Sequence, residues 1–469
     1  MHRLVGAICL PLALCGCSLI PHLEPRKLPV AAAYPGGPAF ATAEAEPNTA
    51  FGWRDFFRDP VTQDLIDLGL ANNRDLRVAA LNIQSAQASY AVTRASLFPT
   101  IDASFSYTQS STPGDVYGST SPQRLREYSF GASAVSWELD LFGRIRSEAE
   151  QSRQTYLSDI DTRRSTELSL MAQISSAYLS WLADCEALRI AESTVRAQSE
   201  STRLTRAKAI TGTSTDLEVA QAEVTLRTAQ VSVAQYTRQV GQDLDQIVLL
   251  VGSPIPDSLV GRMRKAPGLD AGARFPTLVA GLPANLLVRR PDIRAAEHTL
   301  IGANANIGAA RAAFLPQVTL TASGGTASSN LKRLFRPGQA SWSFEPDIKL
   351  PIFDAGANLA NLDIAETQKR IEAANYDKAI QSAFHDVSDA LIARSTYVTQ
   401  VGAQQGLVDS YSRYATLSTA RFKAGADTYL NVLVAQNALF SAQLNLVSYR
   451  LTAAQNLVTL YKALGGGWR

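Results

Sequence analysis

The chain has 469 residues, and its 44 Lys and Arg residues nearly balance its 42 Asp and Glu residues, for a formal net charge of +2. A general nucleic-acid-binding protein needs a basic face to displace counterions, so this composition argues against that class. The sequence has no run of about 20 apolar residues, which excludes a membrane-spanning helix on length grounds. A membrane role would then depend on a β-barrel, whose alternating strands escape a hydropathy scan.

The first residues have the pattern of a bacterial lipoprotein signal. Arg3 precedes an apolar run, residues 4–14, of the length expected for a signal peptide. The run leads into the letters LCGC, which resemble a lipobox and end at Cys17. We therefore expect residues 1–16 to be removed and Cys17 to carry acyl chains. Ser18 favours the outer membrane, because Asp at that place is the usual signal for the inner one. The alternative is ordinary cleavage, with Cys17 unmodified.

The chain contains a long internal repeat. Residues 73–77 (NRDLR) lead through an Ala-rich stretch to residues 94–99 (RASLFP), and residues 290–294 (RPDIR) lead at the same spacing to residues 311–316 (RAAFLP). Later landmarks recur in the same order: 140–143 (DLFG) with 351–356 (PIFDAG), and 212–217 (GTSTDL) with 425–430 (GADTYL). A period this long indicates duplication of a large unit rather than a short solenoid repeat.

Each unit is predicted to run helix, strand, loop, strand, very long helix, turn, helix. Residues 101–108 alternate apolar and polar side chains, and residues 342–352 do so with Pro346 as an interruption. The helices before these strands must end ahead of Pro99 and Pro316, because the residue before a proline disfavours the α conformation. Two polar segments with Gly or Pro are expected to be surface loops, residues 112–126 and 327–340.

The helices that follow are unusually long. Residues 144–211 contain neither Gly nor Pro, and would extend about 100 Å as one helix at about 1.5 Å per residue. Residues 357–401 form a second such run, and the weak breakers Gly402 and Gly406 are not expected to stop it before Gly425. Helices this long and this modestly apolar need neighbouring helices on more than one side, so extended coiled-coil packing is expected.

Compact turns are predicted at the far ends of these helices. Gly212 can adopt the left-handed conformation that ends a helix, and Thr215 with Glu218 has the capping-box pattern for the next one. Gly425 followed by Asp427 or Thr428 repeats the device. The caps alone favour the alternative, a plain helical hairpin without further function.

These landmarks divide the chain into six segments. They are the signal peptide 1–16, an N-terminal anchor and extended segment 17–58, the first repeat 59–252, a crossover 253–285 rich in Pro and Gly, the second repeat 286–464, and a C-terminal tail 465–469.

One chain supplies only four membrane-type strands, whereas a closed barrel needs about eight or more, because an open edge in lipid leaves backbone groups unpaired. Three copies would pool about twelve strands and gather the long helices into a hollow cylinder. The predicted fold class is therefore an α+β membrane protein. Its homotrimer would form a 12-stranded β-barrel, four strands per chain, continuous with a long α-helical barrel.

The chain resembles the TolC-type outer-membrane efflux factors, most closely the OprM-type (NodT-like) lipoproteins, from Cys17 to its end. The motifs that carry the resemblance are 52–57 (GWRDFF), 137–143 (WELDLFG), 281–283 (GLP), 289–293 (RRPDI) and 461–468 (YKALGGGW). The resemblance implies a passive homotrimeric duct in the outer membrane. It also implies a periplasmic adaptor and an inner-membrane pump of RND type as partners, and export of drugs or other small toxic compounds.

The resemblance also implies a gate at the periplasmic tip, around Gly212 and Gly425. Leu430 from three subunits would form an apolar constriction, and Leu217 is its counterpart in the first repeat. Arg421 and Phe422 match a basic-aromatic pair that ties closed tips together in relatives, where Tyr is common in place of Phe422.

The acidic ring of the relatives' gate cannot be carried over. Relatives have Asp one turn beyond the leucine, where this chain has Val434, and Asn431 precedes it. Asp427, Asp216 and Glu218 are possible substitutes, and a helix cap is the alternative role for Asp427.

Other classes fit the sequence less well. Only His22, His298 and His385 lie outside the signal peptide, and no Ser-His, zinc or phosphate-loop motif is present, so we predict no catalytic residue, cofactor or metal ligand. A non-conducting coiled-coil lipoprotein is disfavoured by the alternating strands. A channel for type I secretion or for metal ions remains an alternative within the same fold.

Overall fold

The computed structural model describes residues 18–24, 27–31, 34, 52–113, 115, 118, 120–276 and 289–466. Cys17, the signal peptide and the motif at residues 281–283 lie outside this part of the chain. Within it, no helix combines the length and the apolar character needed to cross a membrane.

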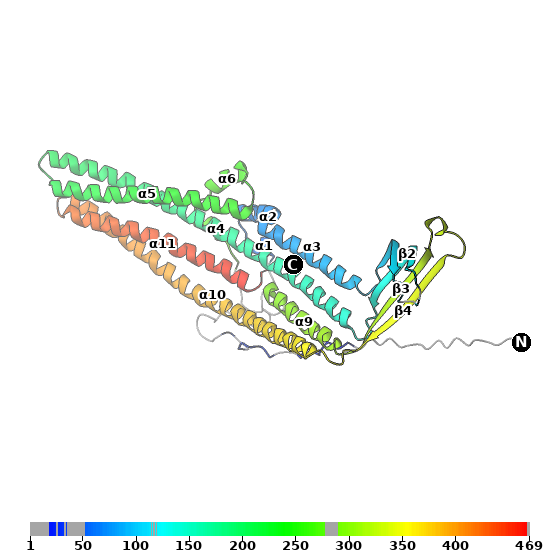
Figure 1. The fold of residues 1–469 in the computed structure, drawn as a ribbon. Helices are drawn as coiled ribbons and strands as arrows, with labels where there is room; N and C mark the ends of the chain where they lie inside the picture. The colour runs from blue at the N-terminus through cyan, green and yellow to red at the C-terminus, as the bar shows by residue number, and fades with distance from the viewer. Residues whose placement is uncertain are drawn as a thin grey trace. The chain divides into compact units, whose positions relative to one another are not determined.

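The elements follow the predicted order in both repeats (Figure 1). The first repeat contains α1 (Trp53–Phe56), α2 (Pro60–Asn72), α3 (Arg74–Ala95), β1 (Ile101–Thr112), β2 (Gln123–Glu138), α4 (Arg144–Ile210) and α5 (Asp216–Val251). Within its described part, residues 253–276, the crossover holds the short helices α6 (Asp257–Arg264) and α7 (Leu269–Gly272). The second repeat contains α9 (Pro291–Ala312), β3 (Gln317–Ser328), the 3-10 turn η3 (Leu331–Arg333), β4 (Ala340–Lys349), α10 (Ala357–Lys423) and α11 (Tyr429–Ala463).

The duplication is confirmed by element lengths. Helices α3 and α9 both have 22 residues, strands β1 and β3 both have 12, and helices α4 and α10 both have 67. Gly402 and Gly406 lie inside α10, as predicted, because neighbouring turns on both sides offset the small helix penalty of a single glycine.

The chain divides into two compact units, and the boundaries fall inside α3, α4, α9 and α10. The first consists of Met1–Arg26, Asn82–Asp159 and Ala295–Tyr376, and the second of Lys27–Leu81, Ile160–Arg294 and Asp377–Arg469. The first unit holds the sheet, and the second holds the turns that join the long helices.

The four strands form one antiparallel sheet in the order β1-β2-β3-β4. Two details of the prediction were wrong. Pro346 does not interrupt the last strand: it lies within β4 opposite Leu320, and an edge strand tolerates the missing N–H donor. The connecting loops are also shorter than predicted, because polar residues at the loop ends, such as Gln123 and Arg124, pair with β1. The polar composition of these residues predicted a loop, but their hydrogen-bonded pairing with the neighbouring strand makes them strand residues.

In the second unit, the last helix of each repeat contacts the residues just before α3 or α9 in the same way, and we call this contact the joint. The last helix ends in a left-handed glycine, Gly252 (φ 76°) or Gly465 (φ 90°), and a Cβ there would lie 2.6 Å from the Asn72 carbonyl oxygen or 2.9 Å from that of Arg289. The next residue in each repeat, Asn73 or Arg290, uses its side chain to bond a carbonyl group at the end of the last helix. The Asn73 side chain donates to the Leu250 carbonyl (2.8 Å), and that of Arg290 to the Ala463 carbonyl (3.2 Å).

The core of the second unit next to this joint is aromatic. The Phe56 ring stacks on Tyr461 at a centroid distance of 4.1 Å and on Phe275 at 5.0 Å, and Phe57 meets Phe56 edge-on. Phe56, Phe57 and Tyr461 are almost fully buried. The motif at residues 52–57 is therefore a packing element that fixes α1 to the C-terminal helix.

Candidate functional site: the sheet faces and the helical tips

The two faces of the sheet differ sharply in polarity. The strand register places one set of side chains together on one face: Ile101, Ala103, Phe105, Tyr107, Tyr128, Phe130, Ala132, Ala134, Val318, Leu320, Ala322, Trp342, Phe344, Pro346 and Ile348. Within the described chain this apolar face is uncovered, with Trp342 79% and Ile101 71% exposed. An exposed apolar surface of this extent indicates contact with lipid or with another chain.

The opposite face is polar. Serine pairs bridge neighbouring strands, Ser106 with Ser129 and Ser323 with Ser343, each with 2.7 Å between the hydroxyl oxygens. The acidic side chains of the paired strand segments that flank these serines lie on this face: Asp102, Glu127, Glu345 and Asp347. The sheet can therefore separate an apolar medium from water, provided that its two edges are paired.

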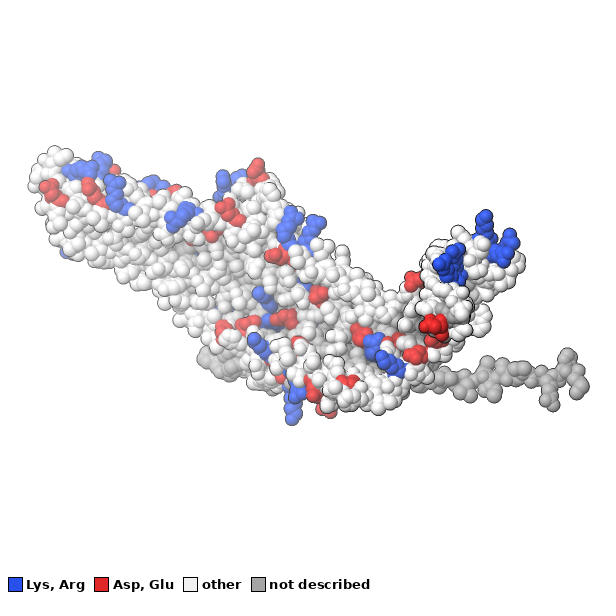
Figure 2. Space-filling model, in the orientation of Figure 1, with Lys and Arg blue, Asp and Glu red and all other residues white. Residues whose placement is uncertain are grey.

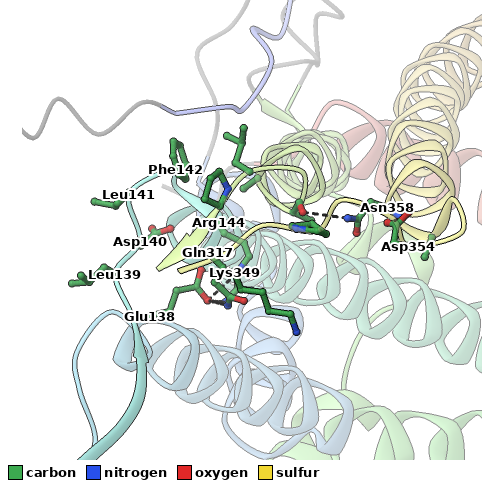
Figure 3. Close-up of a pocket in the computed structure, with 16 residues that line it drawn as sticks. Glu138, Leu139, Asp140, Leu141, Phe142, Arg144, Gln317, Lys349, Asp354 and Asn358 are labelled. Atoms are coloured by element: carbon green, nitrogen blue, oxygen red, sulfur yellow. Dashed lines mark hydrogen bonds and ion pairs between the residues drawn. The ribbon is translucent and has the colours of Figure 1, made fainter. Parts of the chain in front are cut away.

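The strand-to-helix turns of both repeats surround one pocket of about 320 Å³ in the first unit (Figure 3). Asp140 accepts hydrogen bonds from the backbone N–H groups of Ile145 and Arg146 at the start of α4. Asp354 accepts from those of Gly356 and Asn358 at the start of α10, and these donors lower the pKa of its carboxyl group. The repeated motif at these turns is thus a pair of helix caps.

Other polar side chains of the pocket pair with one another. Arg144 donates to Glu138 (2.7 Å), which also accepts from Gln317 (2.6 Å), and Asn358 donates to the Ala313 carbonyl (3.2 Å). These bonds tie the ends of the sheet to the helices that follow. No group of three or more His, Cys, Asp or Glu residues within the described ranges could hold a metal ion.

The α4–α5 turn has the predicted geometry. Gly212 is left-handed (φ 72°), and the capping box between Thr215 and Glu218 is complete. Hydrogen bonds from the Ser214 hydroxyl and the Thr215 backbone lower the pKa of the Glu218 carboxyl group. The Glu218 carboxylate is therefore engaged in capping α5. Leu217, one residue earlier, is exposed.

The α10–α11 turn shares the left-handed glycine, Gly425 (φ 71°), but not the capping box. The N-cap residue Thr428 makes no side-chain cap bond. Asp427 instead accepts from the Thr428 backbone N–H (2.8 Å), the Asn431 amide (2.6 Å) and the Arg421 guanidinium (3.3 Å). These donors, the Asn431 amide first, lower the pKa of Asp427. The predicted repetition of the capping device was wrong, because the third helical position is Asn431 rather than Glu.

A contact that the sequence did not predict joins the two hairpins. Tyr429 is buried against Ala222, Val432 and Leu433, with Phe422 packed on the cluster. Its hydroxyl lies 2.7 Å from that of Ser201 on α4. The residues around Tyr429 gave no signal for this partner, which lies more than two hundred residues away.

Phe422 therefore has an intramolecular environment. Its ring lies 5.2 Å from that of Tyr429, and the Lys208 ammonium group sits 4.5 Å above it. The structure thus brings Arg421 to Asp427 and Phe422 to Tyr429. Leu430 and Leu217 are exposed and have no such partner in the described part of the chain.

A sheet with one uncovered apolar face, joined to duplicated pairs of very long helices, is the architecture of an outer-membrane efflux channel subunit. A family model described as outer membrane efflux protein matches residues 65–253 and 282–466, one stretch in each repeat. The chain belongs to this family. The predicted family and outer-membrane efflux function are thereby confirmed.

Named relatives agree along nearly the whole chain. The probable efflux pump outer membrane protein TtgC of Pseudomonas putida is 44% identical over 455 residues, covering 97% of this chain and 93% of the relative. The cation efflux system protein CusC of Escherichia coli is 37% identical and covers 98% of each chain. The open state of the Neisseria gonorrhoeae MtrE outer membrane channel superposes with a TM-score of 0.87 at 36% identity, covering 97% and 99%. The family consists of efflux proteins rather than enzymes; that this chain catalyses nothing stays a prediction.

Proposed function

We propose that three copies of the chain form a passive duct for small toxic compounds. The observation that supports this most strongly is the sheet. Within the described residues, strands β1 and β4 are each paired on one side only, and most of the apolar face is uncovered. Unpaired backbone groups in lipid cost several kcal/mol each, so β4 of one subunit would pair with β1 of the next. Three sheets then close into about twelve strands, with the polar face around the lumen.

The duct would open and close at the helical tips. Leu430, with Val434 one turn further on, would meet its copies from the other two subunits, and Leu217 would stand beside it on α5. Arg421 and Asp427 hold the α10–α11 turn in shape. Tyr429 holds that hairpin to the neighbouring one through the Ser201 hydroxyl of α4, with Phe422 packed on its ring. Gly212 and Gly425 allow both tip turns to be tight.

The mature chain would be anchored through lipid on Cys17. The nearby residues 18–24 already lie against α9: the Asn304 amide donates to the Pro21 carbonyl (2.7 Å), and a Cβ on Gly308 would come within 3.0 Å of the Ile20 nitrogen. Such a fixed path would hold the anchor close to the body of the protein. Labelling with palmitate and mass measurement of the mature N-terminus test this, with Cys17→Ala as the unlabelled control.

The partners would be a periplasmic adaptor and an inner-membrane pump of RND type, since the duct has no energy source of its own. Relatives named for efflux of toluene, solvents and antibiotics favour apolar organic cargo. Cation efflux is the second candidate, supported by the similarity to CusC. Susceptibility of a deletion strain to toluene, antibiotics and Cu(I) separates the two, and type I secretion would leave all three unchanged.

Conductance in planar bilayers tests the duct directly. The purified protein should run as a trimer by mass and should form channels. Leu430→Ser should raise the conductance, whereas Leu249→Ser, an exposed leucine on α5 away from the tips, should not. A water-soluble monomer without channel activity would refute the proposal.

A further inference from the structure

The loop end of the sheet, where β1 joins β2 and β3 joins β4, carries a cluster of basic side chains. Arg124 and Arg126 of β2 pair with Ser111 and Gln109 of β1, and the register places both on the apolar face. The turn after β3 adds Lys332, Arg333 and Arg336. All five side chains are exposed. Figure 2 shows basic residues gathered at this end of the sheet, with few acidic ones beside them.

The β3–β4 turn is a built structure. Asn330 caps it by accepting the Lys332 backbone N–H (3.0 Å), and the Arg336 N–H donates to the Arg333 carbonyl (3.0 Å). Leu334 is only 1% exposed, so the turn is also anchored by a buried apolar side chain. Its basic side chains are therefore presented from a fixed backbone.

The β3–β4 turn also contacts the apolar face of the sheet. The Phe335 ring lies 5.7 Å from that of Phe130, which belongs to that face. Phe335 thus brings the turn that carries Lys332, Arg333 and Arg336 to the face on which the register places Arg124 and Arg126, and we group the five residues as one cluster. We call it the loop-end basic cluster.

The charge of this region is strongly one-sided. Between residues 112 and 126 and between 328 and 340, the sequence has these five basic residues and one acidic residue, Asp115. The acidic residues of the paired strand segments lie on the polar face instead. Within the paired segments, the register therefore places no carboxylate on the face that carries Arg124 and Arg126.

Along β2 the apolar face changes in a definite order. Ala134, Ala132 and Phe130 are followed by Tyr128, stacked on Tyr107 at 4.6 Å, and then by Arg126 and Arg124. An apolar band, an aromatic pair and basic side chains form the sequence of surfaces that meets acyl chains, the interface and anionic headgroups in turn. A soluble anion would use the charges but not the adjoining apolar band.

We propose that the loop-end basic cluster binds a lipid whose headgroup carries phosphate groups, with its acyl chains along the apolar face. Arginine forks bind phosphate oxygens in pairs, and the turn brings further donors from a second hairpin. The binding would fix the depth of the sheet in the leaflet that its loops reach. This inference rests on the proposed outer-membrane function.

Native mass spectrometry of the detergent-purified protein with bis-phosphorylated lipid A tests the proposal. Each basic side chain near an anionic surface contributes about a five-fold change in binding, so Arg124→Gln with Arg126→Gln should weaken binding about 25-fold. The triple change Lys332→Gln, Arg333→Gln and Arg336→Gln should weaken it further. Lys369→Gln with Arg370→Gln on α10 is the control of equal charge and should have little effect. Dephosphorylated lipid should bind weakly to all variants.

Two results would overturn the proposal: equal loss in the α10 control, or full competition by millimolar inorganic phosphate, which would indicate a site for soluble anions. The conservative variant Arg124→Lys with Arg126→Lys should retain most binding, which separates loss of charge from loss of fold. Conductance of the glutamine variants should persist. Channels without selective lipid binding would refute only this inference, whereas absence of channels in the unmodified protein would refute the proposed function.

Discussion

Arg290 is expected to be the most sensitive single position of the second repeat's joint. Its guanidinium donates two hydrogen bonds to Asp292 (3.0 and 2.6 Å), one to Asp386 (3.1 Å) and one to the Ala463 carbonyl (3.2 Å). The Arg290 side chain is 10% exposed, but the two carboxylates are 39% and 42% exposed. Breaking a fully buried ion pair costs about 3–5 kcal/mol, and partial rehydration of these acids reduces the expected cost of Arg290→Met to about 2–3 kcal/mol.

The lysine variant separates charge from geometry. Arg290→Lys keeps the charge but cannot make the paired contact with Asp292, so we expect a loss of about 1–2 kcal/mol. Asn73→Ala removes the equivalent bond of the first repeat and also the bond that Asn73 accepts from the Leu76 N–H at the start of α3 (3.0 Å), each worth about 1 kcal/mol because both are neutral.

Thermal unfolding followed by circular dichroism at a fixed scan rate measures these effects. A loss of 2–3 kcal/mol should lower the midpoint by about 4 °C in a unit of this size. The midpoint of Arg290→Met should be the lowest, and those of Arg290→Lys and Asn73→Ala should lie between it and the midpoint of the unmodified protein. An Arg290→Met protein as stable as the unmodified one would refute the view that this network holds α9, α10 and α11 together.

Three further predictions concern other parts of the chain. Burial raises the pKa of Asp184 from 3.8 to about 7, with the neighbouring Asp243 as a further cause, and burial raises the pKa of Asp243 as well, so the folded pair holds a proton that the unfolded state releases and stability should fall as pH rises from about 4 to 7. Asp184→Asn should flatten this slope in midpoints measured across that range, and an unchanged slope would contradict the prediction. Tyr429→Phe and Ser201→Ala should each lower stability by about 1 kcal/mol, and the double variant should lose less than the sum of these two losses. Full additivity in a double-mutant cycle would show that the 2.7 Å contact between the two hydroxyl groups contributes nothing. Glu345→Gln with Asp347→Asn on the polar face should reduce the preference of the channel for K⁺ over Cl⁻ in reversal-potential measurements. The control Lys369→Gln on α10 should not reduce it. An unchanged preference in the double variant would place these two acids outside the lumen.

Local sequence signals predicted the elements closely. The run without Gly or Pro at 144–211 became α4 at Arg144–Ile210, because helix breakers act on their own turn of the chain. The alternation at 101–108 predicted the correct faces of β1. Strand ends were missed, since Gln123 and Arg124 are strand residues only through their partners on β1.

The tip was harder to predict, because its residues have several possible partners. Asp427 could have capped α11, faced a lumen or paired with Arg421, and the structure has it bonded to Thr428, Asn431 and Arg421 together. The Tyr429–Ser201 bond depends on how two distant helices pack. The repeat places Asn73 and Arg290 at matching positions, so the sequence indicates that both residues have a similar role. It does not indicate that Arg290 bonds the carbonyl group of Ala463.

The two repeats diverge where a duct would need them to differ. Their helices have kept equal lengths, because α4 and α10 both pass from the first unit into the second and must end at matching turns. At the first turn a closed capping box uses Glu218 locally. At the second turn Asp427 is likewise held by its neighbours, and Leu430 and Val434, 52% and 51% exposed, lie one helical turn apart. Threefold assembly about this turn would therefore stack two apolar layers, and such a constriction excludes water and ions by dewetting rather than by charge.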